Sequence, residues 1–504
     1  MHLASLVEMV ESGFDDRVLL RFGDAEVTGA DFGHLVRRGA STLGEGCEAI
    51  VYVGENHPMF PVALLSAAWA GVPFIPVNYR LDDSRLNALI ERSPRSLVLA
   101  DKVTAPRVAG GGARVFDEWL RNLPDAAEIG PADDDEAMAI VLYTSGTTAE
   151  PKSALLRHRH LMAYLLGTVE FGSAGDSEAM LVSVPPYHIA GVANLLSNLF
   201  AGRRLVYLQQ FDPLAWLATV REEGISHSML VPTMLARIVE ILDGEQADVP
   251  TLQSISYGGA KLSERVLRAA LDAFPTADFV NAYGLTETAS TIALLGPDDH
   301  RRAVDSDDPA VRRRLASAGL VLPTVELEIR DDSDKPLPSG ELGMIFVRGE
   351  QIAGEYATGN LLDTDGWFCT RDRGRIDEDG YLYLEGRTDD IIIRGGENIA
   401  PTEIEDVLLS HPDVLEACVV GLPDEEWGQR IVAVVVRRAG TSVSGDELRA
   451  AVYAELRGSK TPETVFFRPM LPHTDTGKTL RRVVQQDLAS HSTDDYQIAE
   501  HATE

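Results

Sequence analysis

The most informative stretch of the sequence is Ile140-Val-Leu-Tyr-Thr-Ser-Gly-Thr-Thr-Ala-Glu-Pro-Lys152. Its apolar, β-branched first part predicts a short buried strand. Its second part places four hydroxyl groups around Gly146 and ends in a cation. Hydroxyls, inward-turned backbone N–H groups and a cation together form a cradle for an anion. We therefore expect a polyphosphate to bind at a loop whose candidate contacts are Thr144, Ser145, Gly146, Thr147, Thr148 and Lys152.

The spacing from Gly146 onward is close to that of a P-loop but differs from it in two respects. Pro151 stands where the P-loop has its last glycine, and proline has no N–H to donate to a phosphate. The run Ser153-Ala-Leu-Leu156 then continues in an extended pattern, whereas a P-loop leads directly into a helix. The strand–loop–strand context argues against a P-loop. The other alternative to a phosphate site is an ordinary Ser/Thr-rich turn.

Length, charge and cysteine usage limit the classes of protein to consider. A chain of 504 residues is long enough for more than one domain. The formal charge of −33 argues against nucleic acid and anionic membrane surfaces as partners. Three widely spaced cysteines fit a reducing compartment. The first residues lack the basic region of a signal peptide, and no apolar run is long enough for a membrane span. We expect a cytoplasmic protein with no membrane span, either monomeric or a homo-oligomer.

Alternating helix and strand patterns predict an α/β fold. Residues 1–130 and 158–300 each follow the order typical of a mostly parallel sheet covered by helices on both faces. Residues 318–386 become strand-rich and alternate in polarity, which predicts antiparallel strands in a small β-barrel-like subdomain. The last part of the chain has the size and pattern of a small α+β domain. We place the domains at residues 1–387 and 388–504, with the second mobile relative to the first.

Two further stretches place chemistry at the ends of predicted strands. His188 follows a strand that ends in Pro-Pro, and ligands of open α/β sheets lie beyond the carboxyl ends of the strands. Gly258 and Gly259 follow another strand, where glycines let the backbone approach a ligand closely. We expect His188, Val192 and Tyr257 to line a substrate pocket. The alternatives are a buried core histidine and an ordinary glycine turn.

The second specific stretch is Asn281-Ala-Tyr-Gly-Leu-Thr-Glu-Thr288. Its tyrosine offers a flat face to a purine, and its glycine allows close approach. Its first threonine can donate to a phosphate oxygen, and its glutamate can hold Mg²⁺, a hard cation that prefers oxygen ligands. The residues concerned are Tyr283, Gly284, Thr286 and Glu287, and Thr144 is a second candidate ligand of the metal.

These stretches, in this order along nearly the whole chain, resemble the adenylate-forming superfamily of acyl-CoA synthetases, peptide-synthetase adenylation domains and luciferases. The phosphate loop is similar to the superfamily pattern S-G-T-T-G-x-P-K-G, with Ala149 and Ser153 in place of two glycines. Residues 283–287 match Y-G-x-T-E completely, and Pro472-His-Thr-Asp-Thr-Gly-Lys478 is similar to P-x-[TN]-x-x-G-K.

The resemblance also implies roles for residues of the second half of the chain. Asp372 would bind the ribose hydroxyls, although Arg371 replaces the glycine of the usual T-G-D. Asp389 would be the hinge between the domains, and Lys478 the catalytic lysine. By the same resemblance, Arg387 would contact the nucleotide, His188 would border the substrate carboxylate, and Gly395, Gly396 and Trp427 would face CoA.

The function that the resemblance implies is the ATP-dependent ligation of a small carboxylic acid to CoA. Attack of the carboxylate on the α-phosphate of ATP gives an acyl-adenylate and pyrophosphate, with Mg²⁺ as cofactor. A swing of the second domain would then bring CoA to the adenylate, and a thioester and AMP would result. Two alternatives remain: transfer of the acyl group to a carrier protein or an amine, and an acyl-AMP-binding protein with impaired catalysis.

Overall fold

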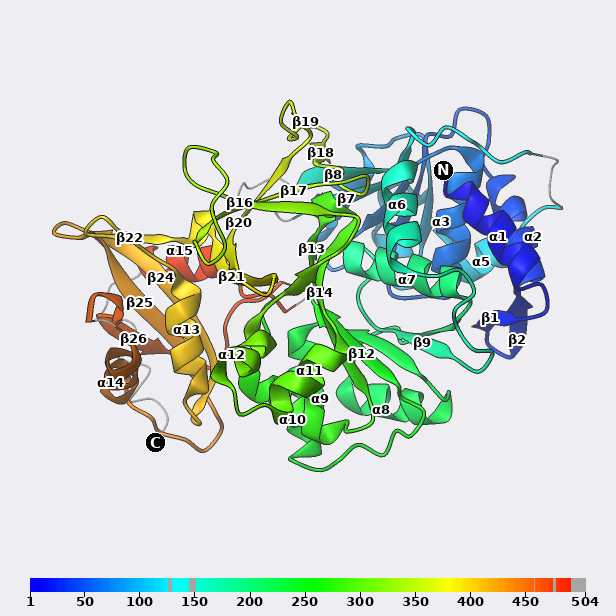
Figure 1. Ribbon diagram of the computed structural model, residues 1–504. Coiled ribbons are helices and arrows are strands. Elements are labelled where there is room, and N and C mark those ends of the chain that lie inside the picture. Colours follow the sequence, from blue (N-terminus) through cyan, green and yellow to red (C-terminus); the bar gives the residue numbers. More distant parts are fainter. Residues whose placement is uncertain (126–128, 145–150, 457, 475–476, 491–504) are drawn as a thin grey trace.

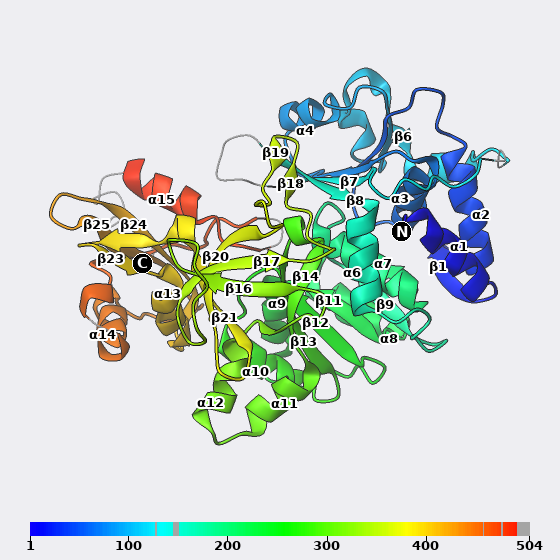
Figure 2. The same ribbon diagram turned by 45° about the horizontal axis from the view of Figure 1, so that its top comes forward.

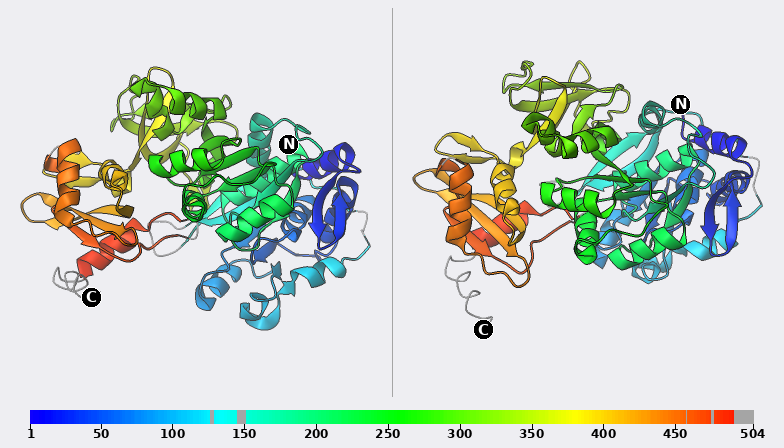
Figure 3. Two further views of the ribbon diagram at one scale, coloured as in Figure 1. Left: turned by 90° about the horizontal axis from the view of Figure 1, so that it is seen from below. Right: turned by 60° about the horizontal axis from the view of Figure 1, so that its bottom comes forward.

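The computed structural model describes residues 1–125, 129–144, 151–456, 458–474 and 477–490 (Figure 1). The predictions for Ser145, Gly146, Thr147 and Thr148, and the substitution at Ala149, therefore lie outside the described residues. Within those ranges, no helix combines the length and apolar character that a membrane span requires. Two large sheets and the helices packed against them form most of the chain, and residues from about 388 onward form a smaller lobe (Figure 3).

The first large sheet carries the strands that flank the phosphate-loop stretch. Its eight strands lie in the order β19-β18-β8-β7-β4-β3-β5-β6, parallel from β7 to β6 and antiparallel where β8 follows β7. Thr144 and Lys152 are Cα partners at the open end of the β7–β8 pair. The bounds are β3 (Ala49–Val53), β4 (Phe74–Val77), β5 (Ser96–Ala100), β6 (Arg114–Val115), β7 (Met138–Thr144), β8 (Lys152–Arg157), β18 (Glu355–Tyr356) and β19 (Gly359–Asn360).

Helices pack against this sheet. Helix α3 is buried along nearly its whole length, because almost all of its residues are apolar, on every side of the helix. A small hairpin of β1 (Val18–Phe22) and β2 (Ala25–Thr28) lies near the N-terminus. The helices are α1 (Ala4–Gly13), α2 (Gly29–Ala40), α3 (Met59–Ala70), α4 (Asp83–Ile90), α5 (Phe116–Arg121), α6 (His158–Thr168) and α7 (Ile189–Ala201).

The second large sheet has eleven strands in the order β10-β9-β11-β12-β13-β14-β15-β21-β20-β17-β16. Its first five strands are parallel, and the rest are antiparallel. The strands predicted as a β-barrel-like subdomain are joined to this sheet through β14 and β15 and form its antiparallel half. The bounds are β9 (Ala179–Val182), β10 (Arg204–Tyr207), β11 (His227–Leu230), β12 (Ser254–Gly258), β13 (Asp278–Leu285), β14 (Ser290–Leu295), β15 (Gly319–Val321), β16 (Glu326–Arg330), β17 (Gly343–Arg348), β20 (Phe368–Ile376) and β21 (Tyr381–Arg387).

The core of the second sheet contains Tyr257, which we expected to line the substrate pocket. That prediction is wrong. Alternation along β12 places Tyr257 on the same face as Ile255, under the helices, where it is 2% exposed. Its hydroxyl bonds His300 Nε2 at 2.9 Å. The helices are α8 (Pro213–Glu222), α9 (Pro232–Leu242), α10 (Glu264–Ala273), α11 (Pro297–Asp305) and α12 (Pro309–Arg312).

The C-terminal lobe is a small α+β unit, as the sequence predicts. It holds a three-stranded sheet, β24-β25-β26, and a short hairpin of β22 and β23. Helix α14 begins with the predicted capping box between Ser444 and Glu447. The bounds are β22 (Ile392–Arg394), β23 (Glu397–Ile399), β24 (Val414–Asp424), β25 (Gly428–Arg437), β26 (Thr464–Phe467), α13 (Pro401–Ser410), α14 (Gly445–Glu455) and α15 (Arg481–Ser490).

Two contacts seat this lobe against the N-terminal part of the chain. Lys261 Nζ lies 2.5 Å from Asp406 Oδ2 on α13. Thr402, at the start of the same helix, donates its hydroxyl to the Glu385 carbonyl of β21 at 2.8 Å. Helix α13 is therefore one of the elements that hold the lobe, and it places the lobe beside β21.

Candidate active site

The first part of the site lies where the side chain of Tyr283, on β13, reaches the neighbouring strands β20 and β21. Tyr283 donates its hydroxyl to Asp372 Oδ2 at 2.7 Å, and Arg387 Nε lies 3.5 Å from Asp372 Oδ1. Asp372 and Arg387 are Cα partners on neighbouring strands. Burial raises the pKa of Asp372, while Tyr283, Arg387 and Lys478 act to lower it. The structure thus brings together four residues that are far apart in sequence.

Lys478 reaches this group from the C-terminal lobe. Its backbone closes a turn in which Thr474 N–H donates to the Lys478 carbonyl at 2.8 Å. Partial burial of the ammonium group, with the neighbouring Arg387, lowers the pKa of Lys478, and Asp372 and Asp390 oppose that shift. A lysine with a cation and carboxylates around it has a shifted pKa, as is common for residues of functional sites.

The turn that carries Lys478 sits directly on the N-terminal part of the chain. Gly477 has φ +74°, and a Cβ built on it would lie 2.0 Å from Thr233 Oγ1 and 2.7 Å from Thr233 Cβ. Thr233 is in the first turn of α9. Only glycine combines this left-handed backbone with so close a contact.

The second part of the site lies at the open end of β7 and β8. Thr144 ends β7 and Lys152 begins β8, with the Lys152 Nζ 6.0 Å from the ring centroid of Tyr356. The Tyr356 hydroxyl donates to Glu287 Oε1. Burial and Glu287 raise the pKa of Tyr356, whereas a hydrogen bond with Thr144 lowers it. Tyr356 therefore joins three of the predicted site residues, and Figure 2 shows β18, which carries it, beside β8 and β7.

Gly258, Gly259 and His188 lie at or beyond the ends of strands, as the sequence predicts, and Gly284 lies inside β13. A Cβ on Gly258 would lie 2.3 Å from the Ala282 carbonyl oxygen, and one on Gly284 would lie 1.9 Å from that of Ser290. Gly259 has φ +86°, which favours glycine. His188 directly precedes α7, at its N-cap position. Val192, on the same helix, is fully buried in the core, so the prediction that it lines the substrate pocket is wrong for the same reason as for Tyr257.

Thr286 and Glu287 lie in a 3₁₀ turn between β13 and β14. The Glu287 backbone carbonyl accepts hydrogen bonds from the N–H groups of Ala353, at 2.9 Å, and Gly354, at 3.0 Å. Within the described ranges, no cluster of three or more His, Cys, Asp or Glu side chains is arranged to hold a metal ion. A single carboxylate still fits Mg²⁺, which is commonly held by one or two carboxylates together with phosphate oxygens and water.

The residues predicted to face CoA form a group of their own on the C-terminal lobe. Gly395 and Gly396 turn the chain between β22 and β23 with φ +57° and +81°, and both are exposed. The Gly395 N–H donates to the Trp427 carbonyl at 2.8 Å, and the Trp427 side chain is 46% exposed. Asp389 lies in the 3₁₀ turn after β21, with its Oδ2 4.0 Å from Arg371 Nη1.

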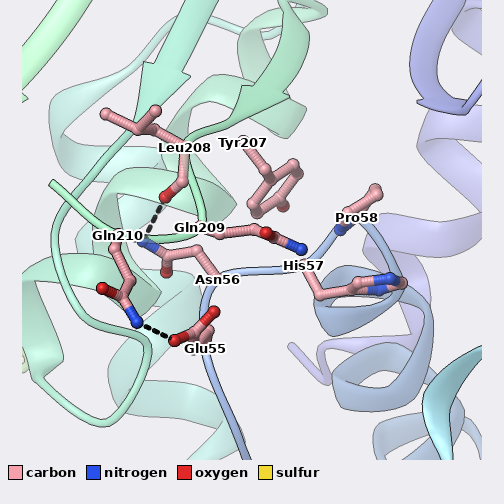
Figure 4. Close-up of a pocket in the computed structure, with 8 residues that line it drawn as sticks. All are labelled: Glu55, Asn56, His57, Pro58, Tyr207, Leu208, Gln209 and Gln210. Carbon is pink, nitrogen blue, oxygen red and sulfur yellow. Dashed lines mark hydrogen bonds between the residues drawn. The ribbon is translucent and has the colours of Figure 1, made fainter. Parts of the chain in front are cut away.

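A cavity of about 580 Å³ lies elsewhere, where the carboxyl ends of β3 and β10 meet. Figure 4 shows the Asn56 side chain donating to the Leu208 carbonyl, at 3.2 Å, and Gln210 bonded to Glu55. None of the predicted residues that the structure describes lines it. Its walls are Glu55, Asn56, His57, Pro58, Tyr207, Leu208, Gln209 and Gln210.

Sequence reasoning missed two residues that the structure places in the site. Tyr356 lies in Gly354-Glu-Tyr-Ala-Thr-Gly359, a stretch with no distinctive motif. Thr233 follows the first proline of a helix and gives no local sign of a contact with residue 477. Both act through contacts across the fold, which a single sequence does not reveal.

Comparisons with known proteins agree with this geometry. The family model described as "AMP-binding enzyme" matches residues 8–357, and "AMP-binding enzyme C-terminal domain" matches residues 403–478. A feruloyl-CoA synthase of Amycolatopsis sp is 32% identical, over 93% of this chain and 95% of that protein.

Solved structures extend the likeness to the whole fold. The ATP-bound MatB from Rhodopseudomonas palustris superposes with a TM-score of 0.85 at 25% identity, covering 97% of this chain and 99% of that one. The amide bond synthetase McbA from Marinactinospora thermotolerans gives 0.84 at 27% identity, covering 96% and 99%. The ordered motifs, their convergence in one site and the matched family models lead to one conclusion: the chain belongs to the AMP-binding enzyme family, the adenylate-forming superfamily that the sequence resembles.

Proposed function

We propose that this protein is an ATP-dependent ligase that activates a small carboxylic acid as its acyl-adenylate and transfers the acyl group to CoA. The observation that carries the proposal is that the turn with Lys478, from one lobe, sits on Thr233 of the other lobe, close enough to the Asp372–Arg387 pair for both residues to shift the pKa of Lys478. Glu287, Thr144 and Lys152 lie in the same N-terminal part of the site. Feruloyl-CoA synthase, the similar protein named above, is a CoA ligase by name.

The first step asks this site to join two anions, a carboxylate and the α-phosphate of ATP. Asp372 accepts the ribose hydroxyls and so fixes the nucleotide, with Tyr283 holding the carboxylate in place. Lys478 lies between the substrate carboxylate and the α-phosphate and offsets the charge that develops there. Mg²⁺, when bound by Glu287 with Thr144 nearby, supplies charge neutralisation on the phosphate oxygens.

Lys152 and the hydroxyls of the phosphate loop hold the pyrophosphate group as it leaves. His188, at the start of α7, borders the substrate carboxylate. The carboxylate oxygen forms a bond to phosphorus as the bond to the pyrophosphate oxygen breaks, so no proton transfer is required in this step. The site therefore acts by alignment and electrostatic stabilisation.

The second step requires the CoA-facing group to reach the adenylate. In the present arrangement Lys478 occupies the site, while Gly395 and Trp427 are exposed on the lobe. Rotation at Asp389 would exchange the two. The CoA thiolate would then attack the acyl carbon, and AMP would leave with the electron pair of the acyl–phosphate bond.

An amine is a second candidate acceptor of the acyl group, because the similar protein McbA is named an amide bond synthetase. In that case an amine would take the place of the thiol, and the first step would be unchanged. The exposed Gly395–Trp427 group favours CoA, since an aromatic side chain and two glycines offer an open surface to an extended cofactor.

The test is a panel of carboxylic acids with ATP and Mg²⁺, with and without CoA, analysed by mass spectrometry. Acyl-CoA and AMP formed from one class of acid would support the proposal and identify the substrate. Acyl-AMP that accumulates equally with and without CoA, and that is consumed by an amine or a carrier protein, would favour the other acceptor. Failure of every acid to give an adenylate would contradict the proposal, provided that the protein binds ATP in a parallel titration.

A further inference from the structure

The hydroxyl of Tyr356 contacts the Glu287 carboxylate, which is proposed to hold Mg²⁺. Its hydroxyl donates to Glu287 Oε1, which leaves the second carboxylate oxygen for a metal. Since a carboxylate on a short 3₁₀ turn can rotate about its side-chain bonds, a fixed donor on one oxygen determines where the other points.

The backbone around Tyr356 holds the same residue from a second side. The N–H groups of Ala353 and Gly354 both donate to the Glu287 carbonyl. Glu287 is thus held at its main chain and at its side chain by one short segment of the chain, residues 353–356.

That segment is also attached to the strand that begins with Lys152. Tyr356 is the Cα partner of Ala154 on β8, and the Ala357 N–H donates to the Ser153 carbonyl at 3.0 Å. Glu355 forms a bidentate pair with Arg157, at 2.8 and 2.9 Å. The contacts run from the end of the phosphate-loop stretch, through residues 353–357, to Glu287.

We infer that Tyr356 is a positioning residue for the divalent cation: its hydroxyl orients Glu287 and fixes that carboxylate relative to Thr144 and Lys152 at the ends of the phosphate loop. The inference rests on the proposed function, because it concerns the cation that accompanies the triphosphate. Residues that orient a metal ligand in this way typically contribute about 10- to 100-fold to metal affinity.

The aromatic ring of Tyr356 has a separable part in this arrangement. It faces the Lys152 ammonium at 6.0 Å, within the range of a cation–π contact. Tyr356→Phe removes the hydroxyl and keeps the ring, so the variant isolates the contact with Glu287 from the contact with Lys152.

The experiment is a titration of Mn²⁺, followed by electron paramagnetic resonance, into the protein with α,β-methylene-ATP. Mn²⁺ prefers the same oxygen ligands as Mg²⁺, and the loss of its free-ion signal on binding gives the bound fraction. We expect Tyr356→Phe to raise the Kd for Mn²⁺ about 10- to 100-fold. In turnover, the Mg²⁺ concentration for half-maximal rate should rise while kcat at saturating Mg²⁺ largely returns.

Tyr381→Phe is the matched control, because Tyr381 also donates to a carboxylate, Asp299 Oδ1, at 2.7 Å, but outside the site. Its Mn²⁺ affinity should equal that of the wild type, and thermal unfolding should show both variants folded. Equal Mn²⁺ affinity of Tyr356→Phe and wild type would overturn this inference alone. A wild-type protein that binds no Mn²⁺ with the nucleotide would overturn both the inference and the proposed site.

Discussion

Gly477→Ala should block the first half-reaction and spare the second. A Cβ at residue 477 would lie 2.7 Å from Thr233 Cβ, whereas carbon atoms in contact are normally about 3.5–4.0 Å apart. Rotation of the Thr233 side chain moves its Oγ1 and Cγ2 but not its Cβ, which is fixed to α9. The turn carrying Lys478 must therefore withdraw by about 1 Å.

The size of the effect follows from that displacement. A misplacement of about 1 Å in a catalytic group can cost about 100-fold in rate, which corresponds to about 2.7 kcal/mol. The left-handed φ of +74° adds a cost of about 1–2 kcal/mol to the docked turn, because alanine adopts it poorly. We expect acyl-AMP formation to fall about 100-fold or more.

The assay follows the two half-reactions separately, with an acid identified in the substrate panel. Acid-dependent exchange of pyrophosphate into ATP reports adenylation, and conversion of synthetic acyl-AMP with CoA reports thioester formation. The second rate should be nearly unchanged, because the Lys478 turn is withdrawn from the site in that step. Adenylation at the wild-type rate would refute the reasoning.

Two further variants separate the collision from the backbone effect. Gly440→Ala, in the same lobe, also places alanine at a positive φ of +79°, but a Cβ there meets no atom within 4 Å. It should lose some stability and keep full adenylation. Adding Thr233→Gly to Gly477→Ala removes all three close atoms and should restore much of the lost rate.

Three other predictions concern charge and backbone strain. Because the pKa of Lys478 is lowered, its ammonium group loses its proton at a lower pH than that of an ordinary lysine. Arg387 contributes to this shift, so Arg387→Gln should move the alkaline limb of the pH profile of adenylation to higher pH. An alkaline limb that does not move would contradict this prediction. Arg481→Met leaves the buried Glu405 carboxylate without its bidentate partner, so the C-terminal lobe should lose about 3–5 kcal/mol in denaturant unfolding, and a loss below about 1 kcal/mol would count against this. Arg371 has φ +62°, so Arg371→Gly should raise the free energy of unfolding by up to about 1 kcal/mol, and a decrease would show that the side chain stabilises the turn.

Much of the fold could be predicted because its signals are local. Hydrophobic periodicity indicated both parallel sheets, and the capping box at Ser444 marked the start of a helix. The antiparallel strands of residues 318–386 were also recognisable, but their attachment to the second sheet was not. Pairing between β14 and β15 depends on contacts between distant segments, which local periodicity does not specify.

The site residues also divide into those that local motifs predict and those that depend on contacts between distant segments. The motifs and the resemblance predict Tyr283, Glu287, Asp372, Arg387 and Lys478 as site residues, and the structure places Tyr283 and Arg387 against Asp372, with Lys478 near them. Prediction failed for Tyr257, because its place near the end of β12 was considered without asking which face of the strand the side chain occupies. Tyr356 and Thr233 could not be found at all, since their importance comes from partners more than sixty residues away in the chain.

The central claim is that Lys478 acts in the formation of the acyl-adenylate and not in its use. The most direct measurement compares wild type and Lys478→Ala in acid-dependent pyrophosphate exchange and in thioester formation from synthetic acyl-AMP. We predict that the variant loses exchange and still makes the thioester at a rate close to that of the wild type. Exchange that persists in the variant, or loss of both reactions in a folded variant, would contradict the account.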